Sequence, residues 1–238
     1  MTKVAFLTTI FPMNEEYLID FFDSLIQQTY KDFDIVVIND GYRNFEKIIS
    51  KYSNLNIIEL PYENSIAKNR EYGINWCIDN SYDILIFGDS DDYFSLNRIA
   101  KSIDLLSTCD IVVNDLTLFD EQGILITNYI SHRVQNNTQI SFNFIKEKNI
   151  FGLSNTAVNV SILNRVQFNE ELIAVDWFLY KNLLEIGLKA IFTNEIKTFY
   201  RQHLSNTIGL NMQDNNFLLW WEKDYKTKGD PLNESTIN

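Results

Sequence analysis

The sequence holds only two cysteines, Cys77 and Cys109, among its 238 residues, and their spacing matches no metal-binding motif. We therefore expect both to be small, buried hydrophobic side chains. No apolar run approaches the roughly 18 residues that a membrane-spanning helix needs. The N-terminus passes directly into a strand-like pattern, which argues against a signal peptide. Together these absences predict a cytoplasmic protein.

Basic residues are also scarce. The chain has 20 lysines and arginines against 32 aspartates and glutamates, for a net charge of −12. A nucleic-acid surface needs a basic footprint, so we expect no nucleic-acid partner. A small anionic ligand is still compatible with this charge, because a bound cation can invert the local field. Peripheral contact with a membrane or a membrane-bound partner through a local patch is compatible as well.

Glycine-rich phosphate loops are missing. The chain has eight glycines and contains neither a Walker A sequence nor a GxGxxG pattern. Residues 8–12, at the end of the first expected strand, contain no glycine. A nucleotidyltransferase on a similar sheet would need a glycine-rich loop at that point, so this enzyme class is disfavoured.

The 45% of hydrophobic residues are enough for a substantial core. In the first half, strand-like and helical patterns alternate, which predicts an α/β fold with a mostly parallel central sheet flanked by helices. The expected strands cover residues 4–10, 33–38, 55–60 and 82–88, and the expected helices cover 15–28, 45–52, 65–80 and 95–106.

The pattern changes after residue 107. We expect a strand pair, then alternating short helices and strands, and a polar tail over 227–238. The expected strands are 110–119, 124–130, 156–163, 190–193 and 196–200, and the expected helices are 141–148, 176–186 and 215–225. Gly187 is placed to end the helix over 176–186.

Three carboxylates, those of Asp89, Asp91 and Asp92, stand within four residues directly after the strand expected over 82–88. Ser90 lies between the first two. Two unit charges about 4 Å apart repel by about 4 kcal/mol at an effective dielectric near 20. A divalent cation relieves that repulsion, and oxygen ligands suit Mg²⁺ or Mn²⁺. Because strands of open α/β sheets present ligand-binding residues at their carboxyl ends, the cluster predicts a metal site for a phosphorylated substrate. The alternative is a solvated acidic turn that caps the next helix.

A second candidate is Asp40, which follows the strand over 33–38. Gly41 permits a tight turn that leaves the Asp40 carboxylate exposed. This carboxylate could accept a hydrogen bond from a base N–H, such as the imide of uracil. An ordinary Asp-Gly turn is the alternative.

Two cations, Lys68 and Arg70, stand at the start of the helix over 65–80. A helix N-terminus with two cations favours an anion such as a diphosphate. The alternative is a solvated helix face. Later in the chain, Asp176 and His203 are a further pair of candidates, because histidine is a common metal ligand or proton carrier. A structural histidine is the alternative there.

Five segments, in this order, resemble family 2 glycosyltransferases of the GT-A type. The opening strand and helix lead into QQTYKDFDIVVINDG over residues 27–41, close to that family's NQTYKDFEIIVVDDG pattern. The remaining matches are NSIAKNREYG over 64–73, the DxD motif Asp89-Ser90-Asp91, Val-Asp-Trp over 175–177, and Tyr-Arg-Gln-His over 200–203. The resemblance spans roughly residues 3–208. It implies a GT-A-type nucleotide-diphospho-sugar transferase fold with a smaller β/α region on the acceptor side.

The resemblance also implies roles for matching residues. Asp40 would contact the uracil of a UDP-sugar, Asp89 and Ser90 would belong to the donor site, and Asp91 would bind Mn²⁺ or Mg²⁺ at the diphosphate. Lys68 or Arg70 would help to hold the donor. Near the reacting carbon, Asp176 would be the general base. His203 would lie at the diphosphate or the metal.

The implied function is metal-dependent transfer of a sugar, with inversion, from a UDP-sugar to a glycan or lipid-linked saccharide. The usual role of the family also implies bacterial surface polysaccharide synthesis. The protein would then act in the cytoplasm or peripherally at the inner face of the cell membrane. Residues 1–106 would form the nucleotide-sugar-binding half, and 107–226 the acceptor-binding and catalytic-base half. Trp177, Trp220 and Trp221 are candidates for stacking on sugar rings, with core packing as the alternative.

Several positions depart from the family pattern. Asn39 replaces the usual first aspartate before Asp40, and Val175 replaces the usual glutamate before Asp176. Asn69 and Arg70 invert the usual order, and Ser65 stands where glycine is common. Glu170 and Glu171 are possible substitute bases. These departures keep open a catalytically impaired GT-A-like module that binds nucleotide-sugars without turnover.

Overall fold

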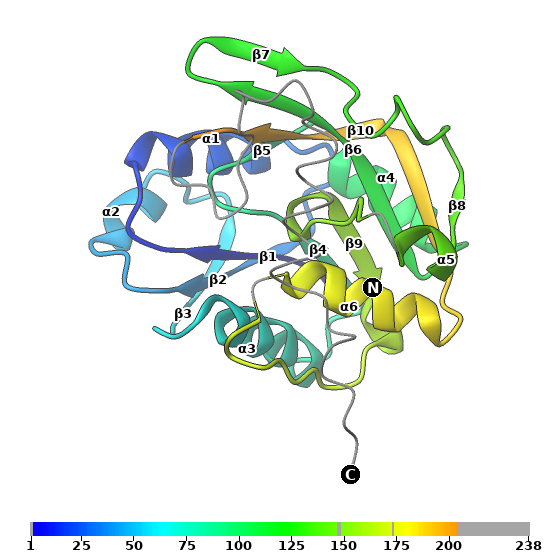
Figure 1. Ribbon diagram of the computed structural model, residues 1–238. Helices are drawn as coiled ribbons and strands as arrows, with labels where there is room; N and C mark the ends of the chain where they lie inside the picture. The colour runs from blue at the N-terminus through cyan, green and yellow to red at the C-terminus, as the bar shows by residue number, and fades with distance from the viewer. Residues whose placement is uncertain (1, 147–148, 173, 204–238) are drawn as a thin grey trace.

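A computed structural model describes residues 2–146, 149–172 and 174–203 of the protein. Within them, the strands form one ten-stranded sheet with helices on both faces (Figure 1). The strand order is β3-β2-β1-β4-β9-β6-β10-β5, with β7 paired to β6 and β8 paired to β10. The predicted α/β class is therefore confirmed.

The first four long strands run parallel, as their alternation with helices predicts. Because these strands are parallel, their carboxyl ends lie along the same edge of the sheet, and the candidate donor residues follow β2 and β4. The elements of this half are β1 (Val4–Ile10), α1 (Glu15–Ile26), β2 (Asp34–Asn39), α2 (Phe45–Ile49), β3 (Asn56–Pro61), α3 (Ile66–Asp79) and β4 (Ile84–Phe87).

The second half extends the same sheet. The short strand β9 lies antiparallel between β4 and β6, and β10 runs parallel to β6. The expected division into a donor half and an acceptor half stays a prediction. The elements are β5 (Tyr93–Phe94), α4 (Arg98–Leu106), β6 (Ile111–Asp120), β7 (Gly123–Ile126), β8 (Gln139–Ile140), α5 (Phe142–Ile145), η1 (Leu153–Asn155), β9 (Thr156–Asn159), η2 (Val160–Ile162), α6 (Val175–Glu185) and β10 (Ala190–Arg201).

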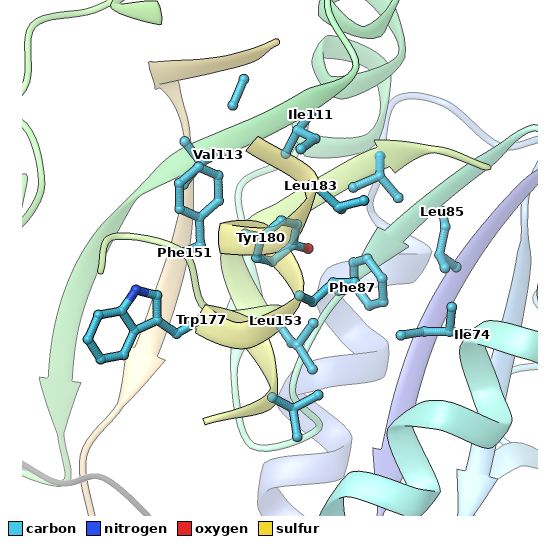
Figure 2. Packing of buried hydrophobic residues seen from close by; sticks show 14 of the residues in the cluster. Ile74, Leu85, Phe87, Ile111, Val113, Phe151, Leu153, Trp177, Tyr180 and Leu183 are labelled. Atoms are coloured by element: carbon cyan, nitrogen blue, oxygen red, sulfur yellow. The ribbon is translucent and has the colours of Figure 1, made fainter. Parts of the chain in front are cut away.

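Two hydrophobic clusters cover the two faces of the sheet. Side chains alternate along β1, so that Leu7 packs toward α3 and α6, whereas Phe6 packs toward α1, α2 and α4. Figure 2 shows Tyr180 of α6 among Phe87, Phe151 and Leu153, where it anchors this helix to the sheet. The packing of α6 therefore fixes the backbone of Asp176, the candidate base, which lies in the first turn of the helix.

The region after the acidic cluster differs from its prediction. Residues Tyr93 and Phe94 form β5, which pairs with β10, and helix α4 begins at Arg98 rather than at Ser95. The Ser95 hydroxyl instead accepts a hydrogen bond from the Lys197 backbone N–H at 3.0 Å. A two-residue strand has no periodicity of its own, so only its partner defines it.

Four further predicted strands change at their ends. The strands expected over 190–193 and 196–200 are one strand, β10, with an irregularity in register between Thr193 and Lys197. The strand expected over 156–163 ends at Asn159 and continues as η2, and the one expected over 124–130 ends at Ile126. The polar residues at 194–195 interrupt the alternation of apolar residues, but they do not interrupt the strand, because β6 pairs on both sides of them.

Arg98 is fully buried beneath the acidic cluster. Its guanidinium donates to the Phe87 carbonyl at 2.8 Å and lies over the Phe94 ring at 4.6 Å. Burial lowers the pKa of Arg98 to about 9, with the Asp92 carboxylate acting in the opposite direction. The side chain therefore keeps its positive charge near neutral pH, under the end of β4.

Gly88 leaves room for two aromatic rings where β4 ends. A Cβ there would lie 2.5 Å from Phe6 and 2.6 Å from Phe94. We expect Gly88→Ala to lower the free energy of unfolding by about 1–3 kcal/mol, the usual effect of overpacking a core. Urea unfolding of the ligand-free protein measures this, with the exposed Ser53→Ala as control. Equal stabilities of the two variants would contradict the prediction.

Candidate functional site

The acidic loop, residues Asp89 to Asp92, follows β4 and contacts the end of β1. The Ser90 hydroxyl is buried and donates to the Thr9 carbonyl at 2.8 Å. This hydrogen bond fixes the middle of the loop against the sheet. Because the hydroxyl faces the protein, a contact of Ser90 with a donor would come from its backbone. The donor-binding role of Ser90 stays a prediction.

Asp89 pairs with Arg70, which projects from the first turns of α3. The Arg70 Nη2 atom lies 2.5 Å from Asp89 Oδ1, and both side chains are largely buried. The Arg70 Nη1 atom is buried with no hydrogen-bond partner among the described residues. Burial raises the pKa of Asp89 above its ordinary value, although the Arg70 charge opposes the shift. The site thus contains a buried cation with unused donor capacity, as an anionic ligand requires.

Lys68 has a different partner. Its Nζ atom lies 2.8 Å from Glu71 Oε2, and Glu71 also accepts the Phe168 backbone N–H at 2.6 Å. Lys68 therefore helps to join α3 to the segment before α6. Of the two candidate cations, Arg70 is the one that the structure pairs with the acidic loop. A donor contact from Lys68 stays a prediction.

Asp91 and His203 are 112 residues apart in the sequence, and their side chains are in contact. His203 Nε2 lies 2.9 Å from Asp91 Oδ2, and both side chains are mostly buried. In the described parts of the chain, no three His, Cys, Asp or Glu side chains are grouped to hold a metal ion. Mg²⁺ is commonly bound through one or two carboxylates together with substrate phosphates. The Asp91 carboxylate fits such a site, in which a diphosphate would complete the coordination, and the His203 imidazole lies within reach of it.

Asp92 is a fully buried carboxylate to which the sequence analysis assigned no role. It accepts hydrogen bonds from the Ser154 hydroxyl and, at 2.8 Å, from the Arg201 backbone N–H. Burial raises the pKa of Asp92 well above its ordinary value, and the charges of Asp91 and Asp89 add to the shift. No motif in the sequence marks Ser154, which lies 62 residues from Asp92.

Arg201 holds the acidic loop from the other side. Its Nε donates to the Asp91 carbonyl at 2.7 Å, and its Nη2 lies 2.5 Å from Asp20 Oδ2 on α1. Its guanidinium lies between the rings of Tyr17 and Phe119, at 4.3 and 4.6 Å. Sequence reasoning named this arginine only as part of a motif. Its contacts fix the end of β10, two residues before His203.

Asp176 lies in the first turn of α6 and faces the same region as the acidic loop. Its Oδ1 accepts the Trp177 backbone N–H at 2.7 Å, and its Oδ2 lies 3.8 Å from the Cβ position of Gly152. Burial and the charges of the three loop aspartates and Asp176 raise the pKa of the Tyr200 phenol well above its ordinary value. Gly152 directly precedes η1, whose Ser154 donates to Asp92, so Asp176 lies beside the turn that contacts the acidic loop.

The turn after β2 has the form that the sequence predicts. Gly41 has a φ of +79°, a conformation that favours glycine. Asp40 is partly exposed, and its Oδ1 accepts the Asn64 backbone N–H at 3.3 Å. This contact brings the turn beside the start of α3. The uracil contact proposed for Asp40 stays a prediction.

Asn39, the departure before Asp40, has a structural explanation. Its side-chain amide donates to Glu59 Oε1 at 2.6 Å and to the Tyr42 carbonyl at 3.0 Å. Its Oδ1 accepts the Tyr42 backbone N–H at 2.7 Å. An aspartate could not donate to Glu59, so the amide suits this position on β2.

We expect Asn39→Asp to lower the free energy of unfolding by about 1–3 kcal/mol at pH 7, because two carboxylates would then meet and a donor would be lost. The penalty should shrink as the pH falls toward about 4, where a protonated carboxyl can donate again. Urea unfolding at both pH values measures this. The control Asn39→Asp/Glu59→Gln should regain most of the stability. A double variant no more stable than Asn39→Asp would contradict the assignment.

Trp177 does not serve as a sugar-stacking residue. Its side chain is buried, and its indole N–H donates to the Ile145 carbonyl at 2.9 Å. Of the two uses open for this residue, core packing is the one that the structure shows, because Trp177 packs α6 against α5. The helix expected over 215–225, with Trp220 and Trp221, lies outside the described residues, as does the tail over 227–238.

Residues 10–173, more than half of the chain, match the family model described as Glycosyl transferase family 2. The chain belongs to glycosyl transferase family 2. This membership confirms the resemblance drawn from the five motifs and makes the protein a glycosyltransferase. The model match includes the acidic loop, Arg70 and η1, but it ends before Asp176.

Two curated family 2 relatives match most of this chain. The UDP-Glc:alpha-D-GlcNAc-diphosphoundecaprenol beta-1,3-glucosyltransferase WfaP of Escherichia coli is 26% identical over 187 residues, which are 76% of this chain and 70% of the relative. Glycosyltransferase GlyA of Streptococcus pneumoniae is 25% identical over 213 residues, 82% of this chain and 30% of the relative. The chain thus spans less than a third of GlyA.

Solved structures confirm the GT-A fold of this family 2 chain. The structure of S. aureus TarS 1–349 in complex with UDP-GlcNAc matches with a TM-score of 0.68 and 17% identity, over 86% of this chain and 60% of that one. GalNAc-T7 with UDP, GalNAc and Mn²⁺ matches with a TM-score of 0.62 and 12% identity, over 86% of this chain and 44% of that one. None of the helices within the described ranges is long and apolar enough to cross a membrane.

Proposed function

We propose that this glycosyltransferase moves a sugar from a UDP-sugar to a saccharide or lipid-linked saccharide acceptor, with inversion and with the help of Mn²⁺ or Mg²⁺. The observation that carries the proposal is the pairing of Arg70 with Asp89 and of Asp91 with His203 on one loop, at 2.5 and 2.9 Å. Two relatives support it through their descriptions: WfaP is named for UDP-Glc and a diphosphoundecaprenol acceptor, and TarS was solved with UDP-GlcNAc.

The described residues offer a contact for each part of the donor. The Asp40 carboxylate would accept the uracil N–H, and Arg70 would donate to the diphosphate through its unpartnered Nη1. Asp89 would accept from the ribose or the sugar. Asp91 and His203 would hold the cation, which supplies charge neutralisation for the diphosphate as it leaves. Burial would strengthen the electrostatic contacts of Arg70, Asp89, Asp91 and His203.

Asp176 would accept the proton of the acceptor hydroxyl. As this oxygen bonds to the anomeric carbon, the bond from that carbon to the diphosphate breaks, and UDP leaves with the electron pair. Attack from the side opposite to the leaving group inverts the anomeric centre. A positioned carboxylate base contributes about 10²–10⁴-fold to such a rate.

Release of UDP tests the proposal directly. The protein is incubated with individual UDP-sugars, Mn²⁺ and saccharide or lipid-linked acceptors, and acceptor-dependent release of UDP supports transfer. A thermal-shift screen of nucleotide-sugars, with and without Mn²⁺, first identifies the donor, since a ligand that binds the native state raises the melting temperature. An absence of any UDP binding would reject the proposal.

A catalytically impaired binding module is the competing function, and it was suggested by Asn39 and Val175. Asn39 has a structural role opposite Glu59, and Val175 is buried in the core against which α6 packs. Neither Asn39 nor Val175 therefore removes a group from the candidate site, and we favour the catalytic function over the binding module. Binding of UDP without transfer to any acceptor would favour the module.

We place the enzyme in the cytoplasm, with peripheral contact at the inner membrane face and a role in bacterial surface polysaccharide synthesis, as part of the same proposal.

A further inference from the structure

The short turn η1 contacts the acidic loop through Ser154. This side chain is 3% exposed, and its hydroxyl makes two hydrogen bonds. It accepts the Asp89 backbone N–H at 3.2 Å, and it donates to Asp92 Oδ2. One hydroxyl thus holds the first and the last residue of the loop that carries Asp91.

The same contacts extend to His203. The second oxygen of Asp92 accepts the Arg201 backbone N–H at 2.8 Å, and Arg201 precedes His203 by two residues. Ser154 therefore acts on both members of the Asp91–His203 pair: on Asp91 through the ends of its loop, and on His203 through Asp92 and the end of β10. A displacement of Asp92 would move both side chains.

The turn also reaches the start of α6. Asn155 Oδ1 accepts the Gly152 backbone N–H at 2.7 Å, and the Thr156 hydroxyl donates to the Gly152 carbonyl at 3.0 Å. The Thr156 hydroxyl lies 2.5 Å from the Tyr180 hydroxyl, one helical turn after Asp176. Residues 152–156 therefore link the acidic loop to the helix that carries the candidate base.

We propose that Ser154 is a positioning residue that sets Asp91 and His203 for the cation and the diphosphate, an inference that rests on the proposed function. The buried carboxylate that Ser154 contacts is Asp92. Burial of a charge is costly, so η1 would gain little stability from this carboxylate if the turn served folding alone. Partners that orient metal ligands typically change metal affinity or activity by about 10–100-fold when they are removed. The hydroxyl of Ser154 would act in this way through Asp89 and Asp92, the two ends of the loop that carries Asp91.

The test compares Ser154→Ala and Ser154→Cys with a matched control, Thr198→Val. Cysteine is somewhat larger than serine and leaves no cavity, but it is a weak hydrogen-bond donor and acceptor, so it serves if the alanine variant fails to fold. Thr198 is equally buried, and its hydroxyl donates to the Ser154 carbonyl at 2.8 Å. Its substitution perturbs the same turn without removing a contact to the carboxylates.

Three measurements are made on each protein: thermal unfolding without ligand, UDP affinity by calorimetry with Mn²⁺ and with EDTA, and the Mn²⁺ concentration for half-maximal transfer. Both Ser154 variants should weaken Mn²⁺-dependent UDP binding and raise this Mn²⁺ concentration, each by about 10–100-fold. UDP affinity in EDTA should stay within about twofold of the wild-type value. Thr198→Val should lose stability and keep the wild-type Mn²⁺ dependence.

The outcomes separate the two proposals. A wild-type protein that binds no UDP rejects the proposed function, and the role of Ser154 with it. Wild-type binding together with an unchanged Mn²⁺ dependence in the Ser154 variants rejects the positioning role alone. An equal shift in Thr198→Val also rejects it, because the effect would then come from general loosening of the turn.

Discussion

Asp91→Ala is expected to abolish detectable transfer and to remove the Mn²⁺ dependence of UDP binding. The substitution deletes the carboxylate that lies 2.9 Å from His203 and leaves only the imidazole of the proposed metal-binding pair. A cation that neutralises a leaving diphosphate contributes several kcal/mol to the transition state, and each 1.36 kcal/mol corresponds to a tenfold change in rate. The loss should therefore be at least about 10²–10³-fold.

Two assays measure this effect: acceptor-dependent UDP release, and calorimetric titration of UDP with and without Mn²⁺. The control is Asp104→Asn, which removes a highly exposed carboxylate on α4 that pairs with Lys101. It should keep wild-type activity and Mn²⁺ response. Wild-type turnover in Asp91→Ala, or a Mn²⁺ response that survives in it, would remove Asp91 from the metal site.

Asp176→Asn is expected to lower the rate of transfer by about 10²–10⁴-fold, the usual contribution of a general base. Asparagine keeps the shape and can still accept the Trp177 backbone N–H, but it cannot take up a proton near neutral pH. In the proposed function, the donor contacts come from the acidic loop and Arg70 and not from Asp176. UDP affinity in the presence of Mn²⁺ should therefore stay within about twofold of the wild-type value.

Single-turnover transfer and UDP calorimetry separate these two effects. The matched controls are Glu170→Gln and Glu171→Gln, which neutralise two exposed carboxylates in the segment before α6. Both should retain transfer. Full activity of Asp176→Asn would reject the base assignment, and a large loss in either glutamine variant would move the role to that glutamate.

The candidate site could be located from the sequence because the relevant signals are local. A buried strand that ends in three acids, and a turn of Asp and Gly after another strand, predict polar groups at the carboxyl edge of a parallel sheet. The structure confirms those strands and their parallel pairing. Alternation of strands and helices likewise predicted the first half well, since each element there has a clear period.

The partners of these groups could not be predicted in the same way. Arg70 and Lys68 are two residues apart, and only packing decides that Arg70 meets Asp89 while Lys68 meets Glu71. The buried contacts of Asp92 join it to Ser154 and Arg201, 62 and 109 residues away. The short strand β5 exists only through its pairing with β10.

By itself, the sequence determined the α/β order, the family and the positions of the acidic residues, because each depends on residues that are neighbours in the chain. Tertiary structure decided which charges pair, that Trp177 is a core residue, and that a serine in η1 holds the acidic loop. Those contacts join segments whose separation leaves no periodic or compositional trace. The physical reason is that burial and hydrogen bonding select partners in space, whereas hydrophobic periodicity reports only on the element that carries it.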